Sequence, residues 1–186
     1  DSLQAERFKA ITRIGDLNTV LRGIDRAVEC GFDRIRLNVV ILDGLNRDEV
    51  VPLTHYALEK GIHIAFIEEM PLGQVNVGGK PLSYVSSDTL QEELAEHFTL
   101  VPMTASDTAG PARDFLIAGS QTQVGFISPH SHNFCAQCNR LRISAEGRLL
   151  MCLGNEESID LRGLLRAGST DEEIKTTIIE SLSIKP

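Results

Sequence analysis

The sequence lacks a long basic run, a long apolar run and a secretory signal peptide. Its 186 residues carry a net charge of −8 at pH 7. Because no basic run is present, we expect no nucleic-acid partner. No apolar run approaches the roughly 18 residues that a membrane-spanning helix needs, so we expect no membrane association.

Cysteine is scarce as well, with four residues in the chain. Cys135, Cys138 and Cys152 lie close together in the sequence, whereas Cys30 stands alone. This usage does not match a secreted disulfide framework and fits a reducing cytoplasm. Cys30 lies at the flank of the apolar stripe of a predicted helix, where we expect a small packing residue.

An initiator methionine is absent too, and the first residues read as the end of a strand. A complete (β/α)8 barrel needs about 200 residues or more. We therefore expect this chain to be a fragment of a longer protein.

The most informative stretch holds the three clustered cysteines, with the spacing C-x2-C-x13-C. Short strands are predicted on both sides of the turn dipeptide Glu146-Gly147. A two-residue loop would pair Leu141 with Cys152, whereas a three-residue loop would shift the register by about one residue. Either hairpin returns Cys152 to the neighbourhood of Cys138.

Three thiolates leave one position of a four-ligand metal site unfilled, and two interpretations are open. In the first, a structural zinc ion takes its fourth ligand from His130 or His132. In the second, three cysteines hold an iron–sulfur cluster that keeps one iron open for substrate. Arg140 and Arg142 follow the second cysteine, and residues i and i+2 of a strand share a face. Two adjacent guanidinium groups are typical of a phosphate or carboxylate clamp, which favours the second interpretation.

Helix and strand patterns alternate in the first third of the chain. We predict a helix over residues 17–30 with Asp16 as its N-cap, a strand over 34–42, a helix over 46–60 capped by Asn46 and a strand over 62–67. This order is typical of βαβ units and a parallel sheet. The first strand has a polar face that includes Arg36 and Asn38, which indicates a ligand-lined surface.

Three further local patterns concern acidic residues. Asp88 with Gln91, and Thr170 with Glu173, have the spacing of capping boxes at helix starts. Glu68 and Glu69 are adjacent on a strand and point to opposite faces, so we expect no shared catalytic pair.

The run from Phe126 to Glu156, FISPHSHNFCAQCNRLRISAEGRLLMCLGNE, resembles the C-terminal cluster motif of the GTP 3′,8-cyclases. These are radical S-adenosylmethionine enzymes of molybdenum cofactor biosynthesis. The later DLRGLLR fits the same pattern. The resemblance extends through DSLQAERFKAIT, RLNVVILDGLN and FIEEMPLG, and so covers most of the chain.

The resemblance implies an α/β fold with two domains. Residues 1–73 would be a partial TIM-type (β/α) barrel segment, and residues 74–186 a smaller α+β domain carrying an Fe–S cluster motif. Cys135, Cys138 and Cys152 would hold a 4Fe–4S cluster with one iron open for substrate. A first cluster, on a motif outside this chain, would support S-adenosylmethionine radical chemistry, so we expect the chain alone to be inactive.

Ligand contacts also follow from the resemblance. It implies that Met70 contacts S-adenosylmethionine, and it implies no catalytic side chain. Relatives commonly carry lysine at the position of Arg36, and some carry arginine where this chain has Ala65. The implied GTP contacts are Arg36, Arg140, Leu141 and Arg142.

The implied activity is conversion of GTP to 3′,8-cyclo-7,8-dihydro-GTP, the first step of molybdopterin biosynthesis. Expected partners are GTP, a second copy of the chain in a homodimer, and cyclic pyranopterin monophosphate synthase, which takes the product. Two alternatives stay open. One is a radical S-adenosylmethionine enzyme whose auxiliary cluster serves another substrate, and the other is a Cys3His zinc module.

Overall fold

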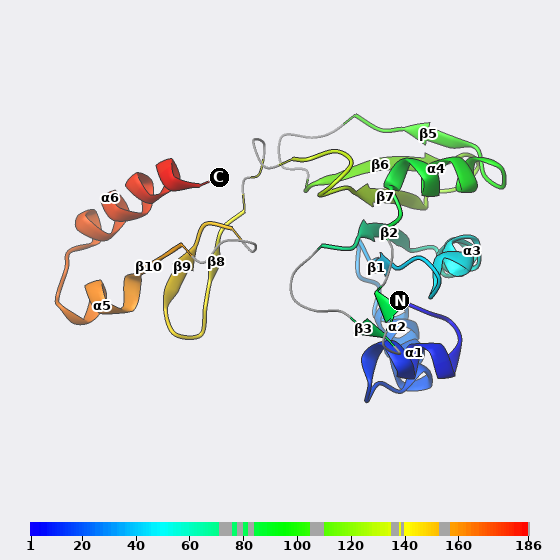
Figure 1. The fold of residues 1–186 in the computed structure, drawn as a ribbon, viewed down its shortest axis with the longest axis horizontal. Coiled ribbons are helices and arrows are strands. Elements are labelled where there is room, and N and C mark those ends of the chain that lie inside the picture. Colours follow the sequence, from blue (N-terminus) through cyan, green and yellow to red (C-terminus); the bar gives the residue numbers. More distant parts are fainter. Residues whose placement is uncertain are drawn as a thin grey trace. The chain divides into compact units, whose positions relative to one another are not determined.

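The structure is a computed structural model that describes residues 1–70, 76–77, 80–81, 84–104, 110–134, 138, 140–152 and 157–185. The chain divides into two compact units, Asp1–Asn133 (unit 1) and Phe134–Pro186 (unit 2), and Figure 1 labels most of their elements. The domain boundary predicted at residue 73 falls inside unit 1 and stays a prediction.

Unit 1 contains most of the secondary structure. In chain order its elements are α1 (Ala5–Thr12), α2 (Leu17–Glu29), β1 (Arg36–Ile41), the 3₁₀ helix η1 (Arg47–Glu49), α3 (Val50–Lys60), β2 (His63–Glu68), β3 (Asn76–Val77), β4 (Lys80–Pro81), α4 (Ser87–Ala95), β5 (Leu100–Pro102), β6 (Ala112–Ile117) and β7 (Gln123–Ile127).

Five strands of unit 1 form one mixed sheet in the order β1-β2-β7-β6-β5. Strands β1, β2 and β7 are parallel, and β6 and β5 continue the sheet antiparallel. The segment β1-α3-β2 is the predicted βαβ unit, so the α/β class is confirmed. Among the described strands, β1 and β5 end the sheet, and a barrel is not seen.

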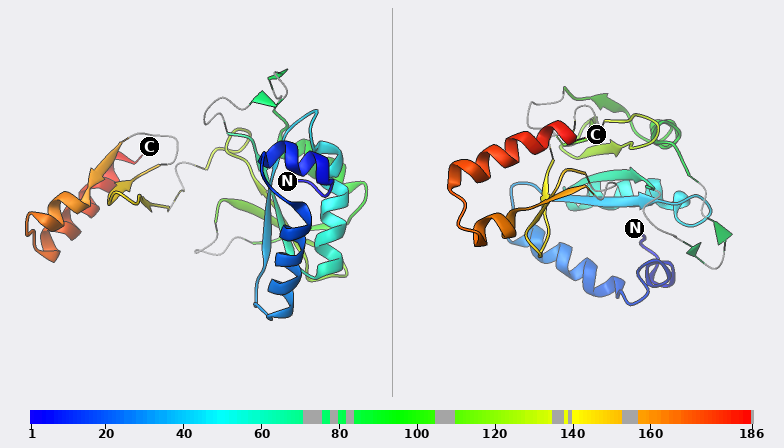
Figure 2. Two further views of the ribbon diagram at one scale, coloured as in Figure 1. Left: turned by 90° about the horizontal axis from the view of Figure 1, so that it is seen from below. Right: turned by 60° about the vertical axis from the view of Figure 1, so that its left-hand side comes forward.

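One face of this sheet carries the main hydrophobic core. Val39, Ile64, Phe66 and Phe126 lie on it and are at most 2% exposed, and α3 and α4 pack against β2 (Figures 1 and 2). Because side chains alternate along a strand, the other residues point to the opposite side, here called the polar face. Polar residues on that face are Arg36, Asn38, His63, Asp114 and Gln123.

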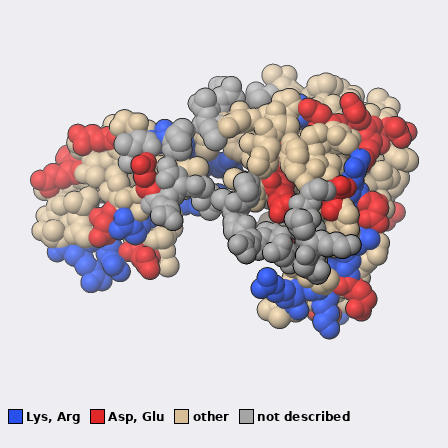
Figure 3. Space-filling model, viewed as in Figure 1, with Lys and Arg blue, Asp and Glu red and all other residues tan. Residues whose placement is uncertain are grey.

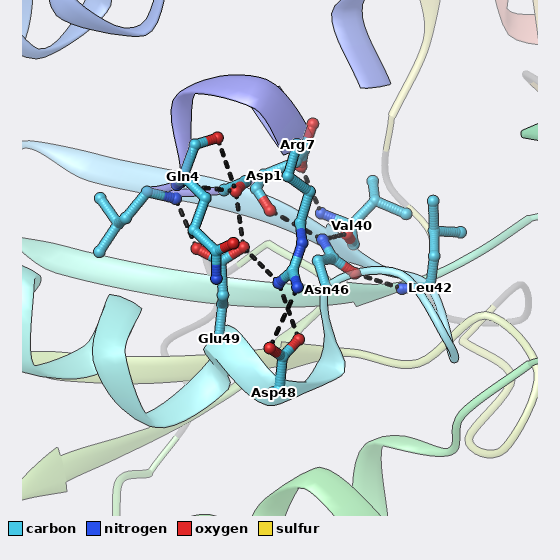
Figure 4. A network of polar contacts seen from close by, with 10 residues as sticks. Asp1, Gln4, Arg7, Val40, Leu42, Asn46, Asp48 and Glu49 are labelled. Atoms are coloured by element: carbon cyan, nitrogen blue, oxygen red, sulfur yellow. Dashed lines mark hydrogen bonds and ion pairs between the residues drawn. The ribbon is translucent and has the colours of Figure 1, made fainter. Parts of the chain in front are cut away.

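Asn46 has a different role from the predicted helix cap, because its side chain makes no capping hydrogen bond. Its amide nitrogen donates to the carbonyls of Asp1 (2.8 Å) and Val40 (2.9 Å), and its oxygen accepts from the Leu42 amide (2.8 Å). The side chain is fully buried, so it satisfies backbone groups that water cannot reach (Figure 4). Asn46 thus ties the start of the chain to the end of β1.

Glu49 is the second buried anchor of the N-terminal segment (Figure 4). Its carboxylate accepts hydrogen bonds from Ser2 Oγ, the Leu3 amide and Arg7 Nη1, each at 2.6 Å. A buried carboxylate is tolerated where charged and neutral donors satisfy it in this way.

The predicted N-cap of α2 is confirmed, because Asp16 accepts from the Thr19 amide at 2.7 Å. The predicted capping box at Asp88 is wrong. Ser86 is the N-cap of α4, so the helix begins two residues earlier than the pattern indicates. Cys30 was also misjudged: it is exposed at the C-cap of α2, because the packed stripe of the helix points elsewhere.

Unit 2 is a three-stranded sheet with two helices. Its elements are β8 (Arg142–Ile143), β9 (Arg148–Leu150), β10 (Ser158–Asp160), α5 (Leu161–Arg166), α6 (Asp171–Ser181) and the 3₁₀ helix η3 (Leu182–Ile184). The strands are antiparallel in the order β10-β9-β8. Leu149, Met151 and Leu161 form a small core on which Ile174 and Ile178 of α6 pack. The capping box of Thr170 and Glu173 is confirmed at the start of α6.

Charges of both signs lie on each unit in the face that Figure 3 shows. Within the described residues, no helix is both long enough and apolar enough to span a membrane.

Candidate functional site

The hairpin that carries the last cysteine is formed by β8 and β9. Arg142 lies opposite Leu150 and Ile143 opposite Leu149, and the Ser144 amide donates to the Arg148 carbonyl at 2.9 Å. The loop therefore has three residues, and the predicted alternative with the register shifted by one is confirmed. The two-residue loop is wrong.

Gly147 makes this loop possible. Its φ of +77° lies in the left-handed region that glycine adopts without strain. A Cβ at this position would also lie 2.7 Å from the Cβ of Arg162 on α5. The glycine thus serves both the turn and the close approach of the hairpin to α5.

Two of the three clustered cysteines lie in the described part of unit 2. Cys138 and Cys152 are both half-buried. Burial raises the pKa of the Cys138 thiol, but hydrogen bonds from the backbone and side chain of Arg140, with the positive charges of Lys185 and Arg140, outweigh it and the net pKa is lowered. A lowered pKa favours the thiolate, which is the form that binds metals.

Cys135 lies outside the described residues, so the geometry of the three-cysteine set is not seen. In the part of the chain that is described, three or more His, Cys, Asp or Glu side chains are nowhere grouped as metal ligands. The metal assignment of Cys135, Cys138 and Cys152 stays a prediction.

Of the two arginines after the cysteine loop, only Arg142 lies in a strand, because β8 begins there. Arg140 precedes the strand, and its guanidinium lies 5.3 Å from the ring centroid of Phe134, a cation–π contact. Arg140, Leu141 and Arg142 are all exposed. Their exposure is compatible with ligand contact, and the shared face predicted for the two arginines stays a prediction.

Arg36 lies in unit 1, on the polar face of the sheet. Its Nη2 atom is 2.7 Å from Oδ1 of Asp114 on β6 and 3.5 Å from Oε1 of Gln123 on β7. His63 lies in register with Arg36. Burial, together with the positive charges of Arg34 and Arg36, lowers the pKa of His63, so this imidazole is neutral at pH 7.

Glu68 is a buried residue whose importance the sequence reasoning missed. It is 1% exposed at the end of β2 and accepts hydrogen bonds from the amides of Ser87 (2.7 Å), His130 (3.0 Å) and Ser131 (3.1 Å), and from Ser131 Oγ (2.5 Å). Burial would raise the pKa of Glu68, but the hydrogen bonds lower it to about 2. Its place after Ile64 and Phe66 on the core face was the available signal.

This carboxylate joins three segments of unit 1: the end of β2, the start of α4 and the segment that leads into the cysteine motif. Met70, the implied S-adenosylmethionine contact, follows Glu68 by two residues and is half-buried. The carbonyl of Glu69 lies 2.8 Å from Nε2 of His130, and the expectation that Glu68 and Glu69 form no catalytic pair stays a prediction.

The two histidines weighed as zinc ligands both have partners in unit 1. Nε2 of His130 contacts the Glu69 carbonyl, and Nε2 of His132 lies 2.8 Å from the carboxylate of Asp88. Asp88 also pairs with Arg113 at 2.8 Å. These contacts hold each imidazole through one ring nitrogen, and either nitrogen of a histidine can bind a metal.

Comparisons with known proteins agree on one family. The family model described as Molybdenum Cofactor Synthesis C matches residues 62–186. Proteins named GTP 3′,8-cyclase match the whole chain: that of Pseudomonas putida (strain W619) is 54% identical, that of Saccharophagus degradans 49% and that of Marinobacter nauticus 48%. In each case the match covers 100% of this chain and 56% of the relative, so the chain spans little more than half the length of these curated relatives.

Proposed function

Because this chain belongs to the Molybdenum Cofactor Synthesis C family, we propose that it is the cluster- and GTP-binding part of a GTP 3′,8-cyclase. The observation that carries the proposal is the similarity to proteins of that name along the whole chain. The β8–β9 hairpin supports it, because the register that pairs Arg142 with Leu150 returns the segment of Cys152 toward that of Cys138.

The residues proposed to hold a 4Fe–4S cluster are Cys135, Cys138 and Cys152. The half-buried Cys138 and Cys152, and the hydrogen bonds that favour the Cys138 thiolate, fit an iron–sulfur ligand set. When bound, such a cluster supplies an open iron site for a substrate base.

Arg140, Leu141 and Arg142 are proposed to contact GTP beside the cluster, and Arg36 to contact it from the polar face of the sheet. Arginine suits the role because its planar fork matches phosphate oxygens. A nucleotide held at its base and at its phosphates has its ribose fixed between the two. Such placement can contribute about 7–11 kcal/mol to lowering a reaction barrier.

The remaining parts of the proposal concern the larger protein. The mixed sheet of unit 1 would belong to a TIM-type barrel, and Met70, two residues after β2, would contact S-adenosylmethionine. We propose that the larger protein converts GTP to 3′,8-cyclo-7,8-dihydro-GTP. It would act as a homodimer in the cytoplasm and pass the product to cyclic pyranopterin monophosphate synthase.

The test is a chimeric cyclase in which this chain replaces the matching part of the Pseudomonas putida protein. Arg140→Ala and Arg142→Ala should each lower kcat/KM for GTP by about tenfold to a hundredfold, the loss expected for one charged hydrogen bond. Iron content should not change. Lys175→Ala, an exposed change on α6, is the control. Unchanged turnover in both arginine variants would contradict the phosphate clamp.

A further inference from the structure

Arg36 and Asp114 form an ion pair that crosses the polar face of the unit 1 sheet. Nη2 of Arg36 lies 2.7 Å from Oδ1 of Asp114. The residues belong to β1 and β6, and two strands, β2 and β7, lie between them. At a strand spacing of about 4.8 Å, their backbones are about 14 Å apart, so both side chains must extend over the intervening strands.

Two small residues leave the space for this contact. Ala65 on β2 is in register with Gly125 on β7, which is in register with Asp114. A Cβ at Gly125 would lie only 2.5 Å from Oδ1 of Asp114 and 3.4 Å from the Cβ of Ala65. The carboxylate therefore lies over the backbone of β7 at Gly125, and the ion pair depends on the small residues at positions 65 and 125.

The ion pair between Arg36 and Asp114 is close, but only one nitrogen of the guanidinium takes part in it. The side chains of Arg36 and Asp114 are only 21% and 23% exposed, so their attraction is screened less than that of a surface pair. Yet Nη2 alone contacts Asp114, and Nε is buried with no acceptor among the described residues. A two-point contact with a phosphate would be stronger than this one-point contact.

We propose that Asp114 is a specificity residue for anionic ligands of this face. Its carboxylate neutralises Arg36 in the ligand-free protein and competes with nucleotide phosphates for the guanidinium. Phosphates approaching Arg36 also meet the like charge of Asp114, so the carboxylate sets how strongly the face attracts anions. The inference rests on the proposed function, in which Arg36 contacts GTP.

The test measures binding of GTP and of guanosine to the anaerobically reconstituted 186-residue protein by calorimetry. Asp114→Asn should bind GTP about tenfold more tightly, the effect of one like charge at a partly screened distance, and should bind guanosine unchanged. Asp25→Asn is the matched control: it removes a carboxylate that pairs with Lys60, between α2 and α3, and should change neither affinity.

Two further variants separate the possible failures. Gly125→Ala keeps every charge but displaces the carboxylate of Asp114. Its affinity for GTP should therefore lie between those of the unaltered protein and Asp114→Asn. If Arg36→Met weakens GTP binding while Asp114→Asn and Gly125→Ala do not strengthen it, Asp114 has no such role and the proposed function stands. If Arg36→Met has no effect, or the unaltered protein does not bind GTP, the proposed contact of Arg36 fails and the inference with it.

Discussion

At the scale of single residues, a buried carboxylate holds the segment that leads into the cysteine motif. Glu68→Gln would place an amide NH2 group where the carboxylate accepts from Ser87, His130 and Ser131. Buried N–H donors would then face another donor and lose their acceptor, which should destabilise unit 1 by about 2–4 kcal/mol.

Urea unfolding followed by tyrosine fluorescence measures this loss, because both tyrosines of the chain, Tyr56 and Tyr84, lie in unit 1. Glu69→Gln is the matched control on the neighbouring residue, because the hydrogen bonds of these donors go to Glu68. Equal stability of the two variants would show that the buried hydrogen bonds contribute nothing net.

The same residue predicts an acid dependence. The pKa of Glu68 is lowered from 4.5 to about 2 in the folded protein, so its stabilising contribution is fully present above pH 4.5. It is lost as the pH falls from about 4.5 toward 2, since the unfolded chain takes up the proton first. The difference in unfolding free energy between the wild type and Glu68→Gln should therefore shrink over that interval. A constant difference would mean that this carboxyl does not titrate with folding.

Individual buried polar residues were hard to predict, because their partners come from distant parts of the chain. Asp114 lies 78 positions from Arg36, and the sequence gives no sign that they meet. The alternation that places Arg36 and Asn38 opposite Val39 is a local property and was read correctly.

At the scale of elements, the β8–β9 hairpin depends on Gly147. Gly147→Ala should destabilise it by about 2–3 kcal/mol, because left-handed backbone strain adds to the contact with Arg162. Gly168→Ala is the control: φ is +81° there, but the added methyl meets no atom within 4 Å, so only about 1 kcal/mol is expected.

Hydrogen exchange of the Ser144 amide, which donates to Arg148 across the hairpin, reports the change. Protection at this amide should fall more in Gly147→Ala than in Gly168→Ala. Equal losses of protection in the two variants would show that the close contact between position 147 and Arg162 does not contribute to stability.

Elements with strong local signals were predicted well. Asp16 and the Thr170–Glu173 box cap their helices as expected, because a cap needs only three or four residues in sequence. At α4 the spacing predicted Asp88 as the cap, but Ser86 caps the helix and Asp88 pairs with Arg113 and His132. Tertiary contacts decided that choice, as they decided the role of Asn46.

At the scale of the whole molecule, the sequence predicted the α/β class from the helix and strand order, and the motif predicted the family. The division into units at residue 133 was not predicted, because strands β5, β6 and β7 complete a sheet begun by β1 and β2. Pairing between strands so far apart in sequence leaves no local pattern. The candidate site was predicted from the spacing of its three cysteines, and the presence of the iron–sulfur cluster is tested by metal analysis.

The most direct test is metal analysis of the 186-residue protein after anaerobic reconstitution with iron and sulfide. We expect about four iron atoms and four acid-labile sulfides per chain, the content of one 4Fe–4S cluster. Serine at Cys135, Cys138 or Cys152 should abolish them, and serine at the exposed Cys30 should not. One tightly bound zinc ion without sulfide, or full iron content in the three serine variants, would contradict the account.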